Sequence, residues 1–448
     1  MRVRLNFAMH TYKRLIPTLL ENHQIHVTLI SFVIQFFIIG QYLDNSIITT
    51  YAPTASDAAD YAERTQIWKE DSFINAFSDG NRMPGYPLLI LICNSLFPNN
   101  GYLVLRLVQM SAIAVSVGIL YLILSRLTST TRAFALASIY AALPLWHFVP
   151  VLIAESFTSF IIILILYLLF RNNETRFSIR DILFISILIS VATYLKPNNL
   201  LLLSLVLGSC FTKKYWIRLW DFSKISLLVG IFLLPWFIFV SAAQPGFYGL
   251  TTNSGGNLYI GTGMVIDYNN GVLAEAAMRW KVDPRNNPTD SIKINSELSA
   301  SQKDSQLREK SLQIWKQRPV REVAYGFEKV KIAFGISSNT RVDSIIGLIS
   351  GTTILMIIVL FKLRKSVSLL FSLITGLLAV ATQAFVFQAD RRFTLPMIFP
   401  TFIITVALFI GGETYLDLKQ SLQRFSKSFA RKVNKQMTKQ KEKVQNAR

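Results

Sequence analysis

The chain has 448 residues, of which 52% are hydrophobic and 16% charged, and its formal net charge is +20. Apolar stretches repeatedly reach the roughly 18 residues that distinguish a membrane span from a buried helix. The composition therefore excludes a soluble protein and predicts an all-α polytopic membrane protein.

Ten apolar stretches are the candidate membrane spans. In chain order they are 26–43, 101–124, 133–150, 156–170, 181–195, 198–211, 225–243, 344–361, 367–387 and 393–411. The apolar run 88–97 follows Pro84 and Pro87 and is too short to cross a hydrocarbon core of about 30 Å. It predicts a re-entrant or juxtamembrane helix.

Basic residues in the short loops predict the topology. If residues 1–25 are cytoplasmic, alternate crossings place the basic loops 126–132, 171–180, 213–224 and 362–365 on the same side. The basic tail 412–448 falls there too and is suited to anionic lipid headgroups, so no nucleic acid partner is needed to explain the charge. The best-fitting location is a bacterial plasma membrane.

This topology divides the chain into two membrane modules separated by a large loop. The first module, 26–243, contains an outer loop at 44–83, and the second module is 343–411. Between them, 244–342 is an extracytoplasmic loop that ends in a predicted surface helix with Val320, Phe327 and Phe334 on one face. Pro319 suits the start of that helix and Gly335 its end. Earlier in the loop, 253–261 is expected to be a flexible turn whose backbone amides approach a ligand, or a plain connection.

Charged residues at the outer ends of the spans suggest a site. Lys196, Arg391 and Arg392 lie in short outer loops, where the charge bias disfavours cations, and Glu155 and Arg82 fall on the same side. Snorkelling to lipid phosphates is the alternative for each cation. Their expected co-location favours a site for an anion.

No His, Cys and carboxylate cluster has metal-ligand spacing, and no resident cofactor is indicated. Cys93 and Cys210 are predicted at opposite ends of the membrane, which argues against a disulfide. Glu155 is a candidate to pair with Lys196, to contact a sugar, or to hold a divalent metal together with Asp57.

Several motifs resemble one enzyme family. The segment 56–61, followed by Arg82-Met83-Pro84-Gly85-Tyr86-Pro87, resembles the first periplasmic loop of polyprenyl-phosphate-sugar glycosyltransferases of the GT-C superfamily. The likeness is greatest to glycosyltransferase family 39, which includes protein O-mannosyltransferases, and to the aminoarabinose transferases. The segments 154–156, 194–197, 257–259 and 391–396 resemble later signatures of the family in the same order, so the resemblance covers 26–411.

The resemblance implies a GT-C type bundle of transmembrane helices with juxtamembrane helices in its outer loops. It implies that a sugar, a hexose or a pentose, passes with inversion from a polyprenyl-phosphate donor to a hydroxyl of a lipid, glycan or protein. Asp57 would be the general base, with Asp60 and Glu155 as second carboxylates. The donor phosphate would be held by Arg82, Lys196, Arg391 and Arg392, and the donor or acceptor pocket would be lined by Tyr61, Tyr86, Asn257 and Tyr259.

Two observations leave alternatives open. Ala58 follows Asp57 where protein mannosyltransferases have adjacent acidic residues, and Asp57 beside Ser56 also suits the electrostatics of a helix start. A transporter or flippase of an anionic lipid or solute would use the same basic cluster, but it should carry ionisable residues near mid-membrane. Besides the glycosyltransferase and the transporter, the third alternative is a protein that binds lipid without catalysis.

Overall fold

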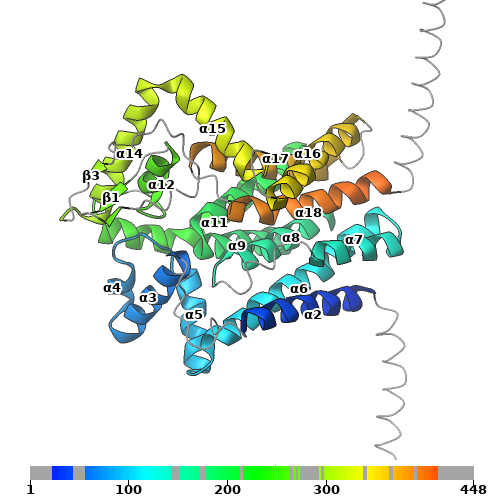
Figure 1. Cartoon of the computed structure of the whole chain (residues 1–448), viewed down its shortest axis with the longest axis horizontal. Coiled ribbons are helices and arrows are strands. Elements are labelled where there is room, and N and C mark those ends of the chain that lie inside the picture. The colour runs from blue at the N-terminus through cyan, green and yellow to red at the C-terminus, as the bar shows by residue number, and fades with distance from the viewer. Residues whose placement is uncertain are drawn as a thin grey trace, which may run out of the picture.

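The computed structural model describes residues 23–43, 56–142, 152–171, 177–211, 215–247, 249–262, 266–268, 271–272, 292–293, 297–336, 341–362, 367–387 and 391–411. Residues 1–22 of the predicted cytoplasmic segment 1–25 and the basic tail 412–448 lie outside these residues. Helices make up almost all of the described chain (Figure 1).

The first half contains α2 (His23–Leu43), α3 (Ser56–Glu70), α4 (Phe73–Phe77), α5 (Gly85–Leu96), α6 (Gly101–Leu127), α7 (Thr130–Ala142), α8 (Glu155–Arg171), α9 (Ile179–Leu195), the 3-10 helix η2 (Pro197–Leu202), α10 (Leu203–Ser209) and α11 (Tyr215–Ala243). The second half contains α12 (Ser254–Gly261), α14 (Ala300–Gln317), α15 (Pro319–Ala333), α16 (Arg341–Lys362), α17 (Val367–Val386) and α18 (Arg391–Ile410). A small sheet in the large outer loop has the order β2 (Gly271–Val272), β1 (Ile266–Tyr268), β3 (Ile292–Lys293). Strand β1 is antiparallel to β2, with Asp267 opposite Val272, and parallel to β3.

The prediction of an all-α polytopic membrane protein is confirmed, with the short strands as a minor addition. Every predicted span coincides with a helix, although 198–211 is divided between η2 and α10, and α7 is described only to Ala142. Within the described residues, three helices have the length and apolar composition to cross a membrane, namely Gly101–Leu127, Ile217–Ala243 and Leu369–Val386. The run 88–97 forms α5, which is too short to cross the bilayer by itself.

The helices run along the long axis of the molecule and give it two distinct ends. At one end lie α3, α4, α12 and α14, and at the other end α7 meets the last turn of α18 (Figure 1). There Arg132 donates to the carbonyl oxygen of Ile410 at 2.8 Å. The predicted basic loop 126–132 and the end of the last span therefore share one side, as alternate crossings require.

Burial separates inner helices from lipid-facing ones. In α8, successive residues from Ile161 to Leu169 are almost all buried, so this helix is enclosed by its neighbours. Helices α2, α11 and α16 instead expose large apolar side chains such as Phe37, Leu227 and Leu348. An apolar surface of this extent on helices of span length is typical of contact with lipid.

The surface helix predicted in the large loop is confirmed as α15. Pro319 occupies its first turn, and Gly335, with φ of 71°, follows its C-terminal end. A positive φ is readily adopted only by glycine, so the residue stops the helix as predicted. Val320 and Phe327 remain exposed, which suits a helix at the membrane surface, whereas Phe334, the third residue predicted on that face, follows the helix and is buried.

A close backbone contact joins two of the sequence motifs. Gly85 begins α5, and a Cβ atom at this position would lie 2.6 Å from the carbonyl carbon and oxygen of Tyr194 and 2.9 Å from the nitrogen of Leu195. Only a residue without a side chain allows α5 to approach the end of α9 so closely. This contact places the Pro84-Gly85 turn against the end of α9, whose next residue in the chain is Lys196.

We expect Gly85→Ala to lower the midpoint of thermal unfolding of the detergent-purified protein, because relieving the overlap with the Tyr194 backbone should cost about 1–3 kcal/mol. Gly230→Ala in α11 is the matched control, since a Cβ there meets no atom within 4 Å. Equal unfolding midpoints for Gly85→Ala and wild type would contradict the contact.

Candidate functional site

The first outer loop places its charged residues on one face of α3. Asp57 lies in the first turn of the helix, where a carboxylate interacts favourably with the helix dipole, and Asp60 and Arg64 follow at helical spacing. Asp57 and Asp60 therefore share one face of the helix.

Arg82 joins the two carboxylates from the turn before α5. Its Nη2 lies 2.8 Å from Asp57 Oδ1 and its Nε lies 2.5 Å from Asp60 Oδ2. Arg64 completes the network, because its Nε lies 2.9 Å from Asp60 Oδ1 and its Nη2 lies 2.8 Å from Asp79 Oδ2. Both oxygens of Asp60 are thus engaged by guanidinium groups.

Arg64 was not identified from the sequence as a site residue, although its spacing of four from Asp60 on a polar helix is a detectable signal. The side chain is buried and also donates to the carbonyl oxygen of Ala76 at 2.7 Å. It therefore fixes the loop after α4 against α3.

Tyr61 lies beside this network. Its ring centre is 5.6 Å from the guanidinium carbon of Arg82 and 4.9 Å from the ring centre of Tyr86. Burial raises the pKa of Tyr61, Arg82 opposes that shift, and the negative charges of Asp57, Glu155 and Asp60 add to it. Tyr61 therefore remains a neutral hydroxyl at physiological pH.

The charge of Arg82 is stabilised by its carboxylate partners. Burial acts to lower the pKa of Arg82, but Asp57, Tyr61 and Asp60 outweigh burial and the pKa is raised. The guanidinium thus stays protonated although the side chain is largely enclosed.

A second ion pair lies at the adjoining ends of three other elements. Lys196 Nζ, between α9 and η2, lies 2.6 Å from Oε1 of Glu155 at the start of α8. The two residues are only 7% and 2% exposed. Removing one partner from such a pair would leave a buried uncompensated charge, which is strongly destabilising.

Two hydrogen bonds run from the ring pair Tyr61 and Tyr86 to the start of α8. Tyr86, beneath Tyr61, donates through its hydroxyl to the Gln109 side chain on α6. Gln109 Nε2 in turn donates to Ser156 Oγ at 3.4 Å, next to Glu155. The first outer loop is therefore tied to the start of α8.

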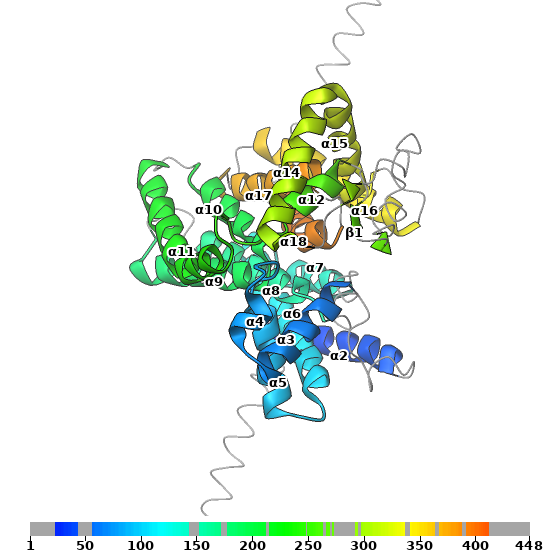
Figure 2. The ribbon, with the colours of Figure 1, turned by 90° about the vertical axis from the view of Figure 1, so that its left-hand side faces the viewer.

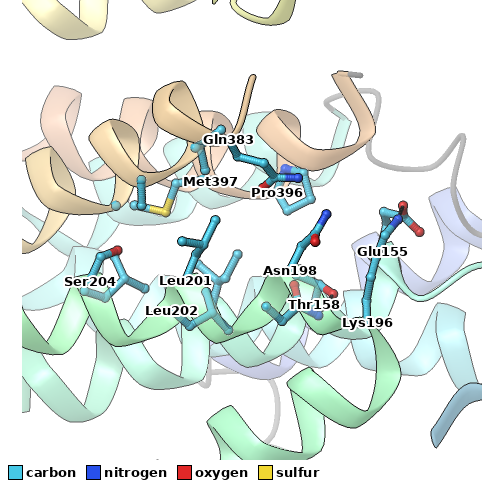
Figure 3. Close-up of a pocket in the computed structure, with 16 residues that line it drawn as sticks. Glu155, Thr158, Lys196, Asn198, Leu201, Leu202, Ser204, Gln383, Pro396 and Met397 are labelled. Atoms are coloured by element: carbon cyan, nitrogen blue, oxygen red, sulfur yellow. Dashed lines mark hydrogen bonds and ion pairs between the residues drawn. The ribbon is translucent and has the colours of Figure 1, made fainter. Parts of the chain in front are cut away.

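Two cavities meet at Lys196 and Asn198. The first, here called the polar chamber, has an empty volume of about 440 Å³ and is lined by Tyr61, Asn81, Arg82, Met83, Leu195, Lys196, Pro197, Asn198, Thr251, Asn253 and Asn257. The second, here called the amphipathic cavity, has about 530 Å³ and lies between α8, η2, α10, α17 and α18 (Figure 3). Its lining includes Glu155, Thr158, Lys196, Asn198, Asn199 and Gln383 besides apolar side chains.

The segment 253–261 was expected to be a flexible turn or a plain connection, and this prediction is wrong because the segment forms helix α12. Its N-terminal end meets the Asp304 carboxylate of α14, which accepts hydrogen bonds from the Gly255 amide and, at 3.2 Å, from Ser254 Oγ. The backbone amide of Gly255 therefore points toward Asp304. Opposite charges at the ends of a helix complement its dipole, so tertiary contacts override the low helix propensity of the glycines.

The C-terminal end of α12 is held by Lys329 of α15. Lys329 Nζ donates to the carbonyl oxygen of Gly261 at 2.6 Å and to that of Phe387, just after α17, at 3.0 Å. Burial lowers the pKa of Lys329 to about 8, while Glu322 acts in the opposite direction, so the ammonium is mainly protonated at neutral pH. Seen from the end of the molecule where α3, α4, α12 and α14 lie, α12, α14 and α15 are on one side of α8, and α3, α4 and α5 are on the other (Figure 2).

The structure brings most of the predicted site residues together. Tyr61, Arg82, Lys196 and Asn257 line the polar chamber, and Asp57 and Asp60 are bound to its Arg82. Glu155 lines the amphipathic cavity, and Tyr86 lies under Tyr61.

Other predicted residues lie elsewhere. Tyr259 is buried between α12 and α14 with Leu307 and Ile314, so it packs the outer loop instead of lining the polar chamber. Arg391 and Arg392 begin α18, and their side chains lie outside the described residues. Asn198, Asn253 and Gln383 line the cavities but were not identified from the sequence, because single uncharged amides give no signal there.

The carboxylates do not fit the predicted alternative of a divalent metal. Asp57 and Asp60 are paired with Arg82, and Glu155 is paired with Lys196, so each carboxylate already faces a cation. Among the described residues, no three His, Cys, Asp or Glu side chains form a group suited to a metal ion.

The chain matches no protein-family model and no curated protein. One solved structure is similar, a crystal structure of ArnT from Cupriavidus metallidurans in the apo state, with 12% sequence identity over 79% of this chain and 77% of that chain. The TM-score is 0.35, which is too low for the likeness to support an assignment of residues or activity.

We expect Lys329→Met to accelerate amide hydrogen exchange in residues 257–262, because the carbonyls of Gly261 and Phe387 would lose a buried donor, at about 1–3 kcal/mol. Lys331→Met is the matched control, since Lys331 lies on the same helix in an exposed pair with Glu328. Equal exchange in both variants would show that Lys329 does not hold α12.

Proposed function

We propose that this protein is a membrane glycosyltransferase of the GT-C type, which transfers a sugar from a polyprenyl-phosphate donor to an acceptor hydroxyl. The main support is one arrangement: a polar chamber lined by the cations Arg82 and Lys196 shares Lys196 and Asn198 with a cavity that has many apolar side chains. The donor combines a charged phosphate, a polar sugar and a hydrocarbon tail, which match the charged, polar and apolar side chains of the two cavities.

Asp57 is the proposed general base. Asp60 has both oxygens engaged by Arg64 and Arg82, which suits it to hold Arg82 in place, whereas Asp57 stands at the start of α3. In the proposed step the acceptor oxygen attacks the anomeric carbon while Asp57 takes the hydroxyl proton. The bond from that carbon to the phosphate oxygen breaks, and its electron pair leaves with the phosphate, giving inversion.

Arg82 and Lys196 are proposed to stabilise the departing phosphate. Cleavage converts a phosphodiester with one negative charge into a monoester with more, so cations placed nearby favour the transition state over the bound donor. Arg391 and Arg392 at the start of α18 are proposed to add to this charge. Lys196 would then exchange part of its interaction with Glu155 for the phosphate.

The proposed orientation places the site on the extracytoplasmic side. The end of the molecule with α7 and the last turn of α18 has the basic loop 126–132, and such loops are cytoplasmic in most membrane proteins. We therefore assign 44–83 and 244–342 to the outer face of a bacterial plasma membrane, where the acceptor is a lipid, a glycan or a protein. Residues 26–243 and 343–411 are the membrane modules that hold this site.

The transporter alternative is less well supported. A transporter places its binding charges in interrupted helices near mid-membrane, but Glu155 begins α8 and Lys196 follows α9. The charged groups of the site therefore lie at helix ends.

We expect Asp57→Asn, in full-length protein reconstituted in lipid nanodiscs, to reduce sugar transfer by about 10²-fold or more, as loss of a general base does. Release of polyprenyl phosphate from a panel of synthetic polyprenyl-phosphate pentoses and hexoses would be measured by mass spectrometry. Glu63→Gln is the matched control, an exposed carboxylate on the same helix.

Active wild type together with a fully active Asp57→Asn variant would remove Asp57 as the base. Wild type that releases polyprenyl phosphate from no donor of the panel, yet moves a labelled anionic lipid across proteoliposomes, would establish the transporter instead.

A further inference from the structure

The amphipathic cavity contains buried polar atoms that have no partner among the described residues. They are Glu155 Oε2, Gln383 Nε2 and Ser204 Oγ, and all three residues line this cavity. An unsatisfied buried polar group costs about 1–3 kcal/mol, and native structures contain few of them. Such atoms around one cavity indicate a polar ligand.

Two of these residues lie at the same end of the cavity. Gln383 of α17 points toward Asn198 of η2 across the open space, and Glu155 with Lys196 closes that end (Figure 3). Glu155 is 2% exposed and Gln383 is 7% exposed. Ser204 lies at the other end, near Leu201 and Met397.

The Glu155 side of the polar end does not suit an anion. Glu155 and Lys196 neutralise each other at 2.6 Å, and the remaining Glu155 oxygen would repel a phosphate placed against it. Two groups at this end are left to bind a ligand: Glu155 Oε2, which accepts a hydrogen bond, and the Gln383 amide, which donates one. A hydroxyl both donates and accepts hydrogen bonds, so a group bearing several hydroxyls matches both.

The rest of the lining offers mainly hydrocarbon contacts. It includes Ile162, Leu201, Leu202, Leu205, Val380 and Met397, of which Leu201 and Met397 lie near Ser204 (Figure 3). These side chains suit an alkyl or isoprenoid chain, which forms no hydrogen bonds and gains from leaving water. The cavity as a whole thus fits an amphiphile with a neutral, hydroxylated head.

We propose that Gln383 and Glu155 bind the sugar hydroxyls of the lipid-linked donor, and that Gln383 therefore helps to select the donor sugar. This inference rests on the proposed function and adds to it a contact to the sugar itself, separate from the cations that hold the phosphate. Lys196, which lines both cavities, would hold the phosphate beside this sugar contact.

The test compares Gln383→Met with wild type in full-length protein in nanodiscs. The first probe is the glycosylated polyprenyl phosphate of the panel that wild type turns over fastest, and the second is undecaprenyl phosphate without a sugar. Loss of one hydrogen bond should raise KM for the glycosylated lipid roughly 2- to 10-fold. The dissociation constant for undecaprenyl phosphate should stay unchanged, because that lipid lacks the hydroxyls.

Gln35→Met is the matched control. Gln35 is also a buried glutamine, 1% exposed, with an unpartnered amide oxygen on the membrane helix α2, but it does not line the amphipathic cavity. It reports the effect of the same chemical change on folding, and it should leave KM unaltered. If Gln383→Met lowers the unfolding midpoint more than Gln35→Met does, Gln383→Asn, which retracts the amide by one methylene, replaces it.

An unchanged KM in the Gln383 variant, or equal weakening of both lipids, would overturn the sugar contact while leaving the proposed function intact. Wild type that turns over no donor of the panel would overturn the proposed function, and the sugar contact with it. The two failures are distinguishable because the second appears before any variant is made.

Discussion

The arrangement of the site depends on the ion pairs that Arg82 forms with Asp57 and Asp60. Asp57 and Asp60 lie on the polar helix α3, whereas Arg82 lies in the turn that leads into α5. Like charges at this spacing repel, and the guanidinium between them offsets that repulsion. Arg64 completes the same network from the far side and leaves Asp60 no oxygen for chemistry.

The second organising element is the junction at Lys196. The residue ends α9 and precedes η2, and the close approach of Gly85 to Tyr194 and Leu195 brings the Arg82 turn against this junction. One lysine therefore borders both cavities. A phosphate bound to Lys196 would therefore lie where the two cavities meet.

The outer loop supplies rigidity by charge as well as by packing. Helix α12 is short and rich in glycine, and its ends interact with Asp304 and Lys329. Because α12 begins beside Asn253 and contains Asn257, holding the helix also holds two amides at the polar chamber. Elements distant from the charged residues thereby determine the shape of the site.

The sequence by itself determined the class of protein, the positions of the spans and the surface helix α15, since hydropathy, proline and glycine act locally. It also indicated most of the charged residues, because cations in short outer loops violate the charge bias. Only the tertiary structure decided that Arg64 engages Asp79, that 254–261 is helical, that Tyr259 is a packing residue and that Gln383 lines the same cavity as Glu155. Each of these depends on contacts between residues far apart in the chain, whose energies have no signature in local composition.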